Sequence, residues 1–462
     1  MAIKFRKPVL IGGVGLSFGL SLWWLLQPSL GEVKELGLMG VMLLGGGLWW
    51  WKQGRSPSVT LPPSPAKITQ KEVEGAIQQG YTLLETLTQE APDADITDLK
   101  AALGEIRPKL DREGLKLAIA GSPLTGKTAL HQALTQVSLP DPLTWREGPV
   151  EGEFTDEDLM IFLTSGDLTE SDLQRLKHLK HQHQRVILAF NKQDRYPPEE
   201  KALILQQLRW RTQTILSPQD IIPLAAAPAP VKVRQHQANG EIREYWEDQK
   251  PEIEELRDRV TTILSQEKTA LITATTWREA LQLQTQIQTR LNQVRRDRAM
   301  PIIEKYQWIA ATAAFANPVP TLDLLATAAI NAQLVIDLGK LYQQKITLAQ
   351  AQTATGTIGQ LMVKLGLVEL SYKAISPLLK SNTVTYIAGG VLEGVSAAYF
   401  TRLAALSIIE YLQEQTINPN SETGFNLDQL SEKLQQVFHH NQRNQFFRQF
   451  VPQTMKRLAV DS

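Results

Sequence analysis

The feature that most constrains the fold is an eight-residue motif of the pattern G-x-x-x-x-G-K-[ST], which runs from Gly121 to Thr128. The apolar run Leu115–Ala120 directly precedes it and is typical of a buried strand, while a helical pattern begins at Ala129. A strand that enters a helix through a glycine-bearing turn is the context that this motif needs. The sequence therefore predicts an α/β unit built around this turn.

Further apolar runs and polar helical stretches alternate along the chain after the motif. The predicted strands are Leu159–Thr164, Val186–Phe190 and Ile221–Ala225, and the predicted helices are Ala129–Gln136, Glu170–Gln182 and Pro197–Thr214. Strands that alternate with helices indicate a mainly parallel sheet with crossover helices. We therefore expect a P-loop NTPase-type domain over residues 115–264, with a small ribbon at Val231–Arg234.

The glycine-bearing turn has the chemistry of a phosphate-binding loop. Glycine lets successive backbone N–H groups converge on a phosphate, and the start of a helix adds a favourable dipole. Lys127 is expected to bridge phosphate oxygens, and the Thr128 hydroxyl is expected to bind Mg²⁺. The expected nucleotide-binding residues of the loop are Gly121, Ser122, Pro123, Leu124, Thr125, Gly126, Lys127 and Thr128. The alternative is a glycine-bearing turn that contains a lysine by chance.

A second motif, Asn191-Lys192-Gln193-Asp194, follows one of the later predicted strands. The carboxylate of Asp194 can accept hydrogen bonds from N1–H and the amino group of guanine, whereas adenine leaves these acceptors unpaired. We expect Asn191 to tie this loop to the phosphate loop and the stem of Lys192 to lie along the base. After the next predicted strand, Ala226 lies where a backbone N–H meets the guanine oxygen. GTP or GDP with Mg²⁺ is the expected cofactor, and a plain polar turn is the alternative.

The region that senses the third phosphate in a working GTPase is shortened in this chain. A D-x-x-G sequence is expected after the third strand, but the chain has one only at Asp111–Gly114, before the phosphate loop. About 22 residues separate Gln136 from Leu159, which is short for two strands and two loops. Two interpretations of Thr144–Pro149 remain open: a reduced remnant in which Glu147 replaces the missing carboxylate, or a plain loop. Hydrolysis of GTP is therefore doubtful, and no catalytic residue is assigned.

The N-terminal 53 residues have the pattern of a transmembrane hairpin. Pro8–Leu26 and Leu36–Trp51 are uncharged, apolar and rich in glycine, and they have lengths close to a bilayer span. Lysine and arginine flank the outer ends, which places both ends and the nucleotide domain in the cytoplasm of a multi-pass membrane protein. A cleaved signal peptide and a buried soluble hairpin are the alternatives. Residues 54–66 are rich in proline and serine and predict a linker.

Helices are expected in the rest of the chain, over residues 67–114 and 265–462. The apolar C-terminal stretches are interrupted by ionisable residues such as Asp323, Asp337 and Arg402, which favours a buried bundle over membrane-spanning helices. Homo-oligomers could form through these helices. The chain has 48 basic and 48 acidic residues, so nucleic acid is not an expected partner. The absence of cysteine excludes thiolate metal sites and cysteine nucleophiles.

These motifs resemble those of a known family. Residues 115–264 resemble an Era-type, translation-factor-class GTPase domain, through G-S-P-L-T-G-K-T, N-K-Q-D and A-A-A. The C-terminal half resembles the membrane-associated helical domain of unknown function 697, through Asn317–Asp323 and the later residues Gln333, Asp337, Leu341 and Tyr342. The resemblance implies a membrane-anchored GTP-binding protein, with guanine nucleotide and the lipid bilayer as partners. A GTPase or GTP sensor with a degenerate switch region is one expectation, and a non-hydrolysing membrane scaffold is the other.

Overall fold

The computed structural model describes most of the chain after the linker. The described residues are 68–137, 139, 143–148, 155–236, 242–316, 320–380, 391–414, 424–443, 450–454 and 457. The chain divides into two units, Met1–Pro63 and Ser64–Ser462, and every described residue belongs to the second. The predicted transmembrane hairpin and the predicted linker lie outside the described residues.

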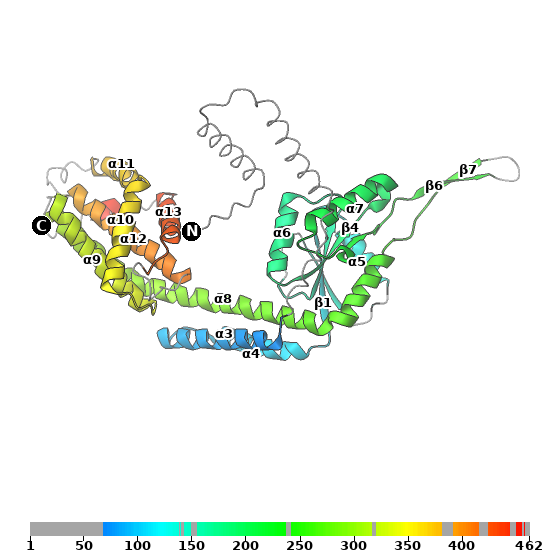
Figure 1. Ribbon diagram of the computed structural model, residues 1–462, viewed down its shortest axis with the longest axis horizontal. Helices are drawn as coiled ribbons and strands as arrows, with labels where there is room; N and C mark the ends of the chain where they lie inside the picture. Colours follow the sequence, from blue (N-terminus) through cyan, green and yellow to red (C-terminus); the bar gives the residue numbers. More distant parts are fainter. Residues whose placement is uncertain are drawn as a thin grey trace, which may run out of the picture. The chain divides into compact units, whose positions relative to one another are not determined.

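A five-stranded parallel sheet forms the centre of the nucleotide domain (Figure 1). Its strands are β1 (Leu115–Gly121), β2 (Leu143–Gly148), β3 (Leu159–Thr164), β4 (Arg185–Phe190) and β5 (Ile221–Pro223). They lie in the order β2-β1-β3-β4-β5, and all four pairings are parallel. The predicted parallel sheet with crossover helices is confirmed.

Helices cover both faces of this sheet because the central strands are apolar on both sides. Leu117 and Ile119 of β1 pack in one cluster with α5 (Lys127–Thr135) and the first turns of α8. Ala118 and Ala120 pack in another cluster with α6 (Glu170–His181) and α7 (Pro198–Thr212). Burial on both faces is the arrangement expected of parallel sheets with crossover helices.

The interpretation of Thr144–Pro149 as a plain loop is wrong for residues 144–148, which belong to strand β2. Leu143 pairs with Leu115 and Gly148 with Ala120, in parallel register along the whole of β1. This strand lies at the sheet edge, and its burial alternates between half-buried and exposed positions. Polar residues are compatible with such an edge. The segment therefore lacks the continuous apolar run by which the other strands could be predicted.

One long helix, α8 (Glu254–Ala316), connects the nucleotide domain to the C-terminal helices (Figure 1). It runs without a break through residues 264 and 265, where the sequence indicated a domain boundary. Its middle third packs against α3 (Gln70–Glu90), α4 (Thr97–Ile106) and the short helix η1 (Arg107–Asp111) in one apolar cluster. The polar, glutamine-rich face of α8 is thus partly covered by the helices that precede the sheet.

The C-terminal part is helical, as predicted. It comprises α9 (Pro320–Leu341), α10 (Leu348–Lys364), α11 (Leu367–Lys380), α12 (Val391–Glu414) and α13 (Leu427–Arg443), which share one core with the end of α8. Among the described residues, only α12 is long and apolar enough to cross a membrane. Of its most apolar window, 72% is buried inside the helical domain, as for the core helix of a bundle.

An antiparallel hairpin, β6 (Val231–His236) and β7 (Ile242–Glu247), extends away from the sheet (Figure 1). The sequence predicted a ribbon at Val231–Arg234, and the strand is two residues longer. All six residues of β7 are exposed. Short helical turns η2 (Gln193–Arg195) and η3 (Pro218–Asp220) complete the elements of the domain.

Candidate functional site

The two motifs meet at the carboxyl edge of the parallel sheet. The turn Gly121–Gly126 follows β1, and Asn191 follows β4. The side-chain amide of Asn191 donates to the carbonyl of Thr125 at 2.8 Å and accepts from the N–H of Ala226, after β5, at 2.9 Å. Asn191 is 2% exposed, so both hydrogen bonds are shielded from water. One buried amide therefore joins the three loops that the sequence assigned to nucleotide binding.

At two positions, the backbone of the turn has a shape that only glycine permits. Gly126 has φ of 98°, in the left-handed region, and a Cβ there would lie 2.4 Å from Nδ2 of Asn191. A Cβ on Gly121 would lie 2.6 Å from the carbonyl oxygen of Leu163 in β3. The two glycines let the turn lie flat against Asn191 and β3. The turn therefore has the tight approach of backbones that a phosphate cradle needs.

Helix α5 begins at this turn with its N-terminus uncapped. Gly126 is the N-cap residue, and no side chain accepts from the first N–H groups of the helix. Unpaired N–H groups and the helix dipole favour an anion at this place. The Lys127 ammonium donates to the carbonyls of Gly121 at 2.8 Å and Ser122 at 3.0 Å. Both partners are uncharged, so a phosphate in the turn can compete for this cation with a stronger, charge-assisted hydrogen bond.

The remaining residues of the turn differ in exposure. Pro123 is exposed, and Leu124 has φ of 63° with 88% of its surface exposed. Thr125 is buried, and its hydroxyl donates to the carbonyl of Ser122 at 2.9 Å. The Ser122 hydroxyl in turn donates to Asp172 of α6 at 3.3 Å. An exposed, left-handed leucine is a strained feature, and strain of this kind concentrates at functional loops.

Oxygen donors suited to Mg²⁺ lie beside the turn. The Thr128 hydroxyl donates to Oε2 of Glu147 at 3.1 Å, and Glu147 is in β2, next to β1. The other carboxylate oxygen lies 2.5 Å from Nδ1 of His131, one turn further along α5. Mg²⁺ prefers hard oxygen ligands and is often bound by one carboxylate with phosphate oxygens and water. Thr128 and Glu147 supply such oxygens, and among the described residues no group of three or more His, Asp or Glu is placed to hold a metal ion by itself.

The loop Asn191–Asp194, to which the sequence assigned reading of the base and which we call the base-reading loop, is fixed in place at Lys192 and open at Asp194. Lys192 has φ of 62°, and its ammonium donates to the carbonyl of Leu124 at 2.6 Å. Asp194 is exposed, and its Oδ2 accepts from the N–H of Ala229 at 3.1 Å. The N–H of Ala226, which the sequence assigned to the base, donates instead to Asn191. The exposed Asp194 carboxylate can therefore still accept further hydrogen bonds from the solvent side.

Two residues that the sequence did not single out connect this loop to α8. The Gln193 side chain donates to the Glu252 carboxylate at 2.7 Å. Ala225 and Glu252 also exchange backbone hydrogen bonds of 3.1 and 2.9 Å. Glu252 precedes the first residue of α8 by only two positions. No sequence pattern marks Glu252, because its role depends on a non-local bridge.

The misplaced D-x-x-G sequence lies at the other edge of the sheet. Asp111 ends η1, and Gly114 precedes β1. The following Arg112 pairs with the buried Asp158, just before β3. Because the phosphate turn follows β1, Asp111 and Gly114 lie at the opposite end of that strand. They therefore lie away from the candidate site.

Comparison with known proteins identifies one domain in the sequence. Residues 278–443 match the model of DUF697, a domain of unknown function. The match begins in the middle of α8 and extends through α13. It confirms the resemblance that the sequence indicated for the C-terminal part. A search of curated proteins gives no match to this chain.

Three solved structures illustrate the structural likenesses, all at low similarity. One is a GTP-binding protein from the archaeon Sulfolobus solfataricus in complex with GDP, at 17% identity, covering 45% of this chain and 70% of that one, with a TM-score of 0.23. The bacterial dynamin GTPase LeoA from ETEC has 14% identity over 82% of this chain and 72% of its own, with a TM-score of 0.22. A chain from an oligomerised bacterial dynamin pair has 12% identity over 84% and 74%, with a TM-score of 0.25. At TM-scores this low, the functions of these proteins do not transfer to this chain.

Proposed function

We propose that this chain is a membrane-anchored protein that binds a guanine nucleotide at the carboxyl edge of its parallel sheet. The observation that carries the proposal is the pair of hydrogen bonds made by Asn191, to Thr125 in the phosphate turn and to Ala226 after β5. This buried amide brings the phosphate turn and the base-reading loop into one site.

Each part of the nucleotide has a counterpart in this site. The N–H groups at the start of α5 and the Lys127 ammonium hold the phosphates, with Gly126 allowing close approach. The stem of Lys192 borders the base, and Asp194 accepts from the two guanine donors. Mg²⁺, when bound, neutralises charge on the phosphate oxygens. Thr128 and Glu147 are the residues that hold it, and His131 fixes the orientation of the Glu147 carboxylate.

Sensing of the nucleotide, rather than rapid hydrolysis, is the activity that we assign to the site. The D-x-x-G sequence at Asp111–Gly114 lies at the opposite end of β1 from the turn, so it does not supply the carboxylate and glycine of a working switch region. A structural role for the turn is the second candidate, because Lys127 and Ser122 are already held by groups of the protein itself. The rate of phosphate release from GTP is measured for full-length wild type and for Lys127→Ala, which separates hydrolysis at this site from binding. Equal rates of phosphate release would show that this site does not hydrolyse GTP.

Base selection is tested by an exchange of the carboxylate for an amide. In Asp194→Asn, one acceptor becomes a donor, which suits the second carbonyl of xanthine and opposes the amino group of guanine. We expect GTP and GDP to bind at least tenfold more weakly and xanthosine nucleotides more tightly, measured by equilibrium binding with labelled nucleotides. The matched control is Asp248→Asn, an exposed aspartate outside the site. Equal affinity of wild type for ATP and GTP would contradict base reading, and no binding of either would support the structural role.

A further inference from the structure

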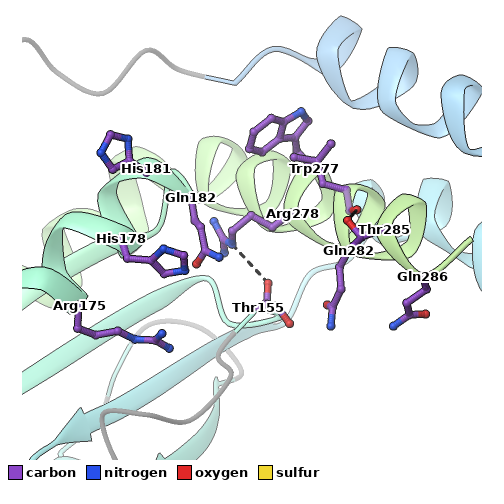
Figure 2. A pocket seen from close by; sticks show the side chains of 11 residues that line it. Thr155, Arg175, His178, His181, Gln182, Trp277, Arg278, Gln282, Thr285 and Gln286 are labelled. Carbon is purple, nitrogen blue, oxygen red and sulfur yellow. Dashed lines mark hydrogen bonds between the residues drawn. The ribbon is translucent and has the colours of Figure 1, made fainter. Parts of the chain in front are cut away.

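A cavity of about 640 Å³ lies between α6 and α8, away from the site described above (Figure 2). The residues that line it are Thr155, Arg175, His178, His181, Gln182, Trp277, Arg278, Leu281, Gln282, Thr285 and Gln286. Thr155 precedes β3, and the last turn of α6 precedes β4. The cavity is therefore at the amino edge of the parallel sheet. The phosphate turn is at the carboxyl edge, so the two sites are separate.

The lining of this cavity is cationic and rich in hydrogen-bond donors. None of the described residues that line it is acidic. Figure 2 shows His178 of α6, Gln182 directly after that helix and Arg278 of α8 extending into the same space. The side chains of His178 and Gln282 bond to no other described residue, whereas Arg175 has an interaction of its own. Donors without partners at a cavity wall are available to a ligand.

Arg278 is a buried cation that no carboxylate pairs with directly. It is 5% exposed, and its guanidinium donates to the carbonyl oxygens of Glu157 at 2.7 Å, His183 at 3.2 Å and Thr155 at 3.4 Å. Burial lowers the pKa of Arg278 to about 10, in spite of the attraction of Asp158 and other carboxylates. Asp158 is already bound by Arg112. The positive charge of Arg278 is thus compensated mainly by neutral oxygens.

From this geometry we propose that the cavity binds a small phosphate-bearing molecule or headgroup. Its volume is within the range of small-molecule sites, which is about 300–1,000 Å³. A phosphate has more acceptor oxygens than a carboxylate and matches donors that converge from Arg278, His178 and Gln282. Trp277 and Leu281 provide an apolar wall for the organic part of the ligand.

The first test measures how many labelled pyrophosphate ions bind to the full chain in a neutral detergent. We expect two classes of site in wild type. Lys127→Ala should remove the class at the phosphate turn. The double variant His178→Ala/Gln282→Ala should weaken the other class at least tenfold. Both of these residues lack side-chain partners, so the variant keeps the fold, whereas a substitution of Arg278 would disturb three backbone contacts.

The matched control is the double variant His439→Ala/Gln174→Ala, which removes a histidine and a glutamine from exposed helix positions. It should bind as wild type does. Unchanged binding by His178→Ala/Gln282→Ala would overturn the cavity site. Unchanged binding by Lys127→Ala would instead count against the proposed nucleotide site and leave the cavity site intact. The two proposals therefore fail separately.

Competition then identifies the source of the phosphate. Inorganic phosphate and inositol 1,4,5-trisphosphate, a soluble lipid headgroup, are each titrated against pyrophosphate bound to Lys127→Ala. Stronger displacement by the inositol compound assigns the cavity to a headgroup, and stronger displacement by inorganic phosphate assigns it to a free anion. Displacement by polyglutamate at lower concentrations than either compound would identify an acidic peptide and overturn the phosphate assignment.

Discussion

At the scale of single residues, Gly126 is the position where the backbone of the site is least tolerant of change. Its φ of 98° is unfavourable for any residue with a Cβ, and that Cβ would meet Nδ2 of Asn191 at 2.4 Å. Gly126→Ala is expected to break the Asn191–Thr125 hydrogen bond and lower the free energy of unfolding by about 1–3 kcal/mol. Guanine nucleotide affinity should fall with it, as measured by equilibrium binding and denaturant unfolding.

The control for this substitution is Gly104→Ala, in the last turn of α4. A Cβ on Gly104 has no atom within 4 Å and lies in an α-helix. Alanine there should raise stability by about 0.5–1 kcal/mol, because it restricts the unfolded chain. A loss of stability in Gly126→Ala no larger than the change in Gly104→Ala would contradict the strained geometry of the turn.

Glu157, also at the residue scale, gives a prediction that depends on pH. Burial raises the pKa of its carboxyl group, and the neighbouring Asp156 adds to the shift while Arg146 opposes it. One carboxylate oxygen, Oε2, is buried without a hydrogen-bond partner. The folded-state pKa of this group is above its unfolded value of 4.5. Its contribution to stability is therefore fully present below pH 4.5 and is lost as pH rises through the folded pKa. Glu157→Gln should therefore raise the unfolding temperature at pH 7.

Thermal unfolding of wild type and Glu157→Gln between pH 4 and pH 7 checks this sign. The difference should shrink toward pH 4, where the glutamate is protonated in both states. A variant that is less stable than wild type at pH 7 would mean that the ion pair with Arg146, at 3.0 Å, outweighs the burial of the charge.

At the scale of elements, the Asp158 carboxylate connects the segment before β1, strand β1 itself and helix α8. Its carboxylate accepts from Arg112 before β1, from the N–H of Lys116 in β1 at 2.7 Å and from the Thr275 hydroxyl of α8 at 2.8 Å. The side chain is fully buried. Removing one partner of a buried ion pair leaves a charge without compensation, so Asp158→Ala should lower the free energy of unfolding by about 3–5 kcal/mol.

The adjacent Asp156 provides the control. It also forms an ion pair, with Lys116 at 3.1 Å, but both side chains are 41% exposed. Exposed pairs contribute little, so Asp156→Ala should lower the free energy of unfolding by less than about 1 kcal/mol. Denaturant unfolding of both variants measures the difference. Similar losses would show that Asp158 does not hold α8 against the sheet.

Local sequence patterns predicted those helices and strands that are determined by their own residues and not by distant contacts. The apolar runs of β1, β3 and β4 fall within a residue of their predicted bounds, because strands buried on both faces are continuously apolar. Strand β2 was not predicted, since an edge strand with Trp145 and Arg146 has no such run. The continuity of α8 was not predicted either, because its polar middle is held by α3, more than 150 residues earlier.

At the site, the motif residues could be found, but Glu252 and His131 act through contacts that only the folded chain shows.

At the scale of the whole molecule, the proposed anchor is in the first 53 residues. These include the uncharged runs Pro8–Leu26 and Leu36–Trp51. We expect the full chain to stay with membranes in alkaline carbonate and a chain that begins at Gly54 to be released. Sedimentation and flotation of both chains, with nucleotide binding as the check of folding, measure this. Retention of the shortened chain would move the anchor to the C-terminal helices, of which α12 is the apolar candidate.

The length of α8 has a mechanical consequence. The helix starts two residues after Glu252, which is bridged to the base-reading loop, and it contributes to the core of the helical domain at Ile303 and beyond. Up to Arg278, however, the helix packs on the sheet and is bonded to residues at its amino edge. From Arg278 to Pro301 its axis spans about 35 Å, at 1.5 Å per residue, so a tilt of about 5° at Arg278 would displace the far end by about 3 Å. A small shift of the helix against the sheet would thus be enlarged on its way to the C-terminal helices.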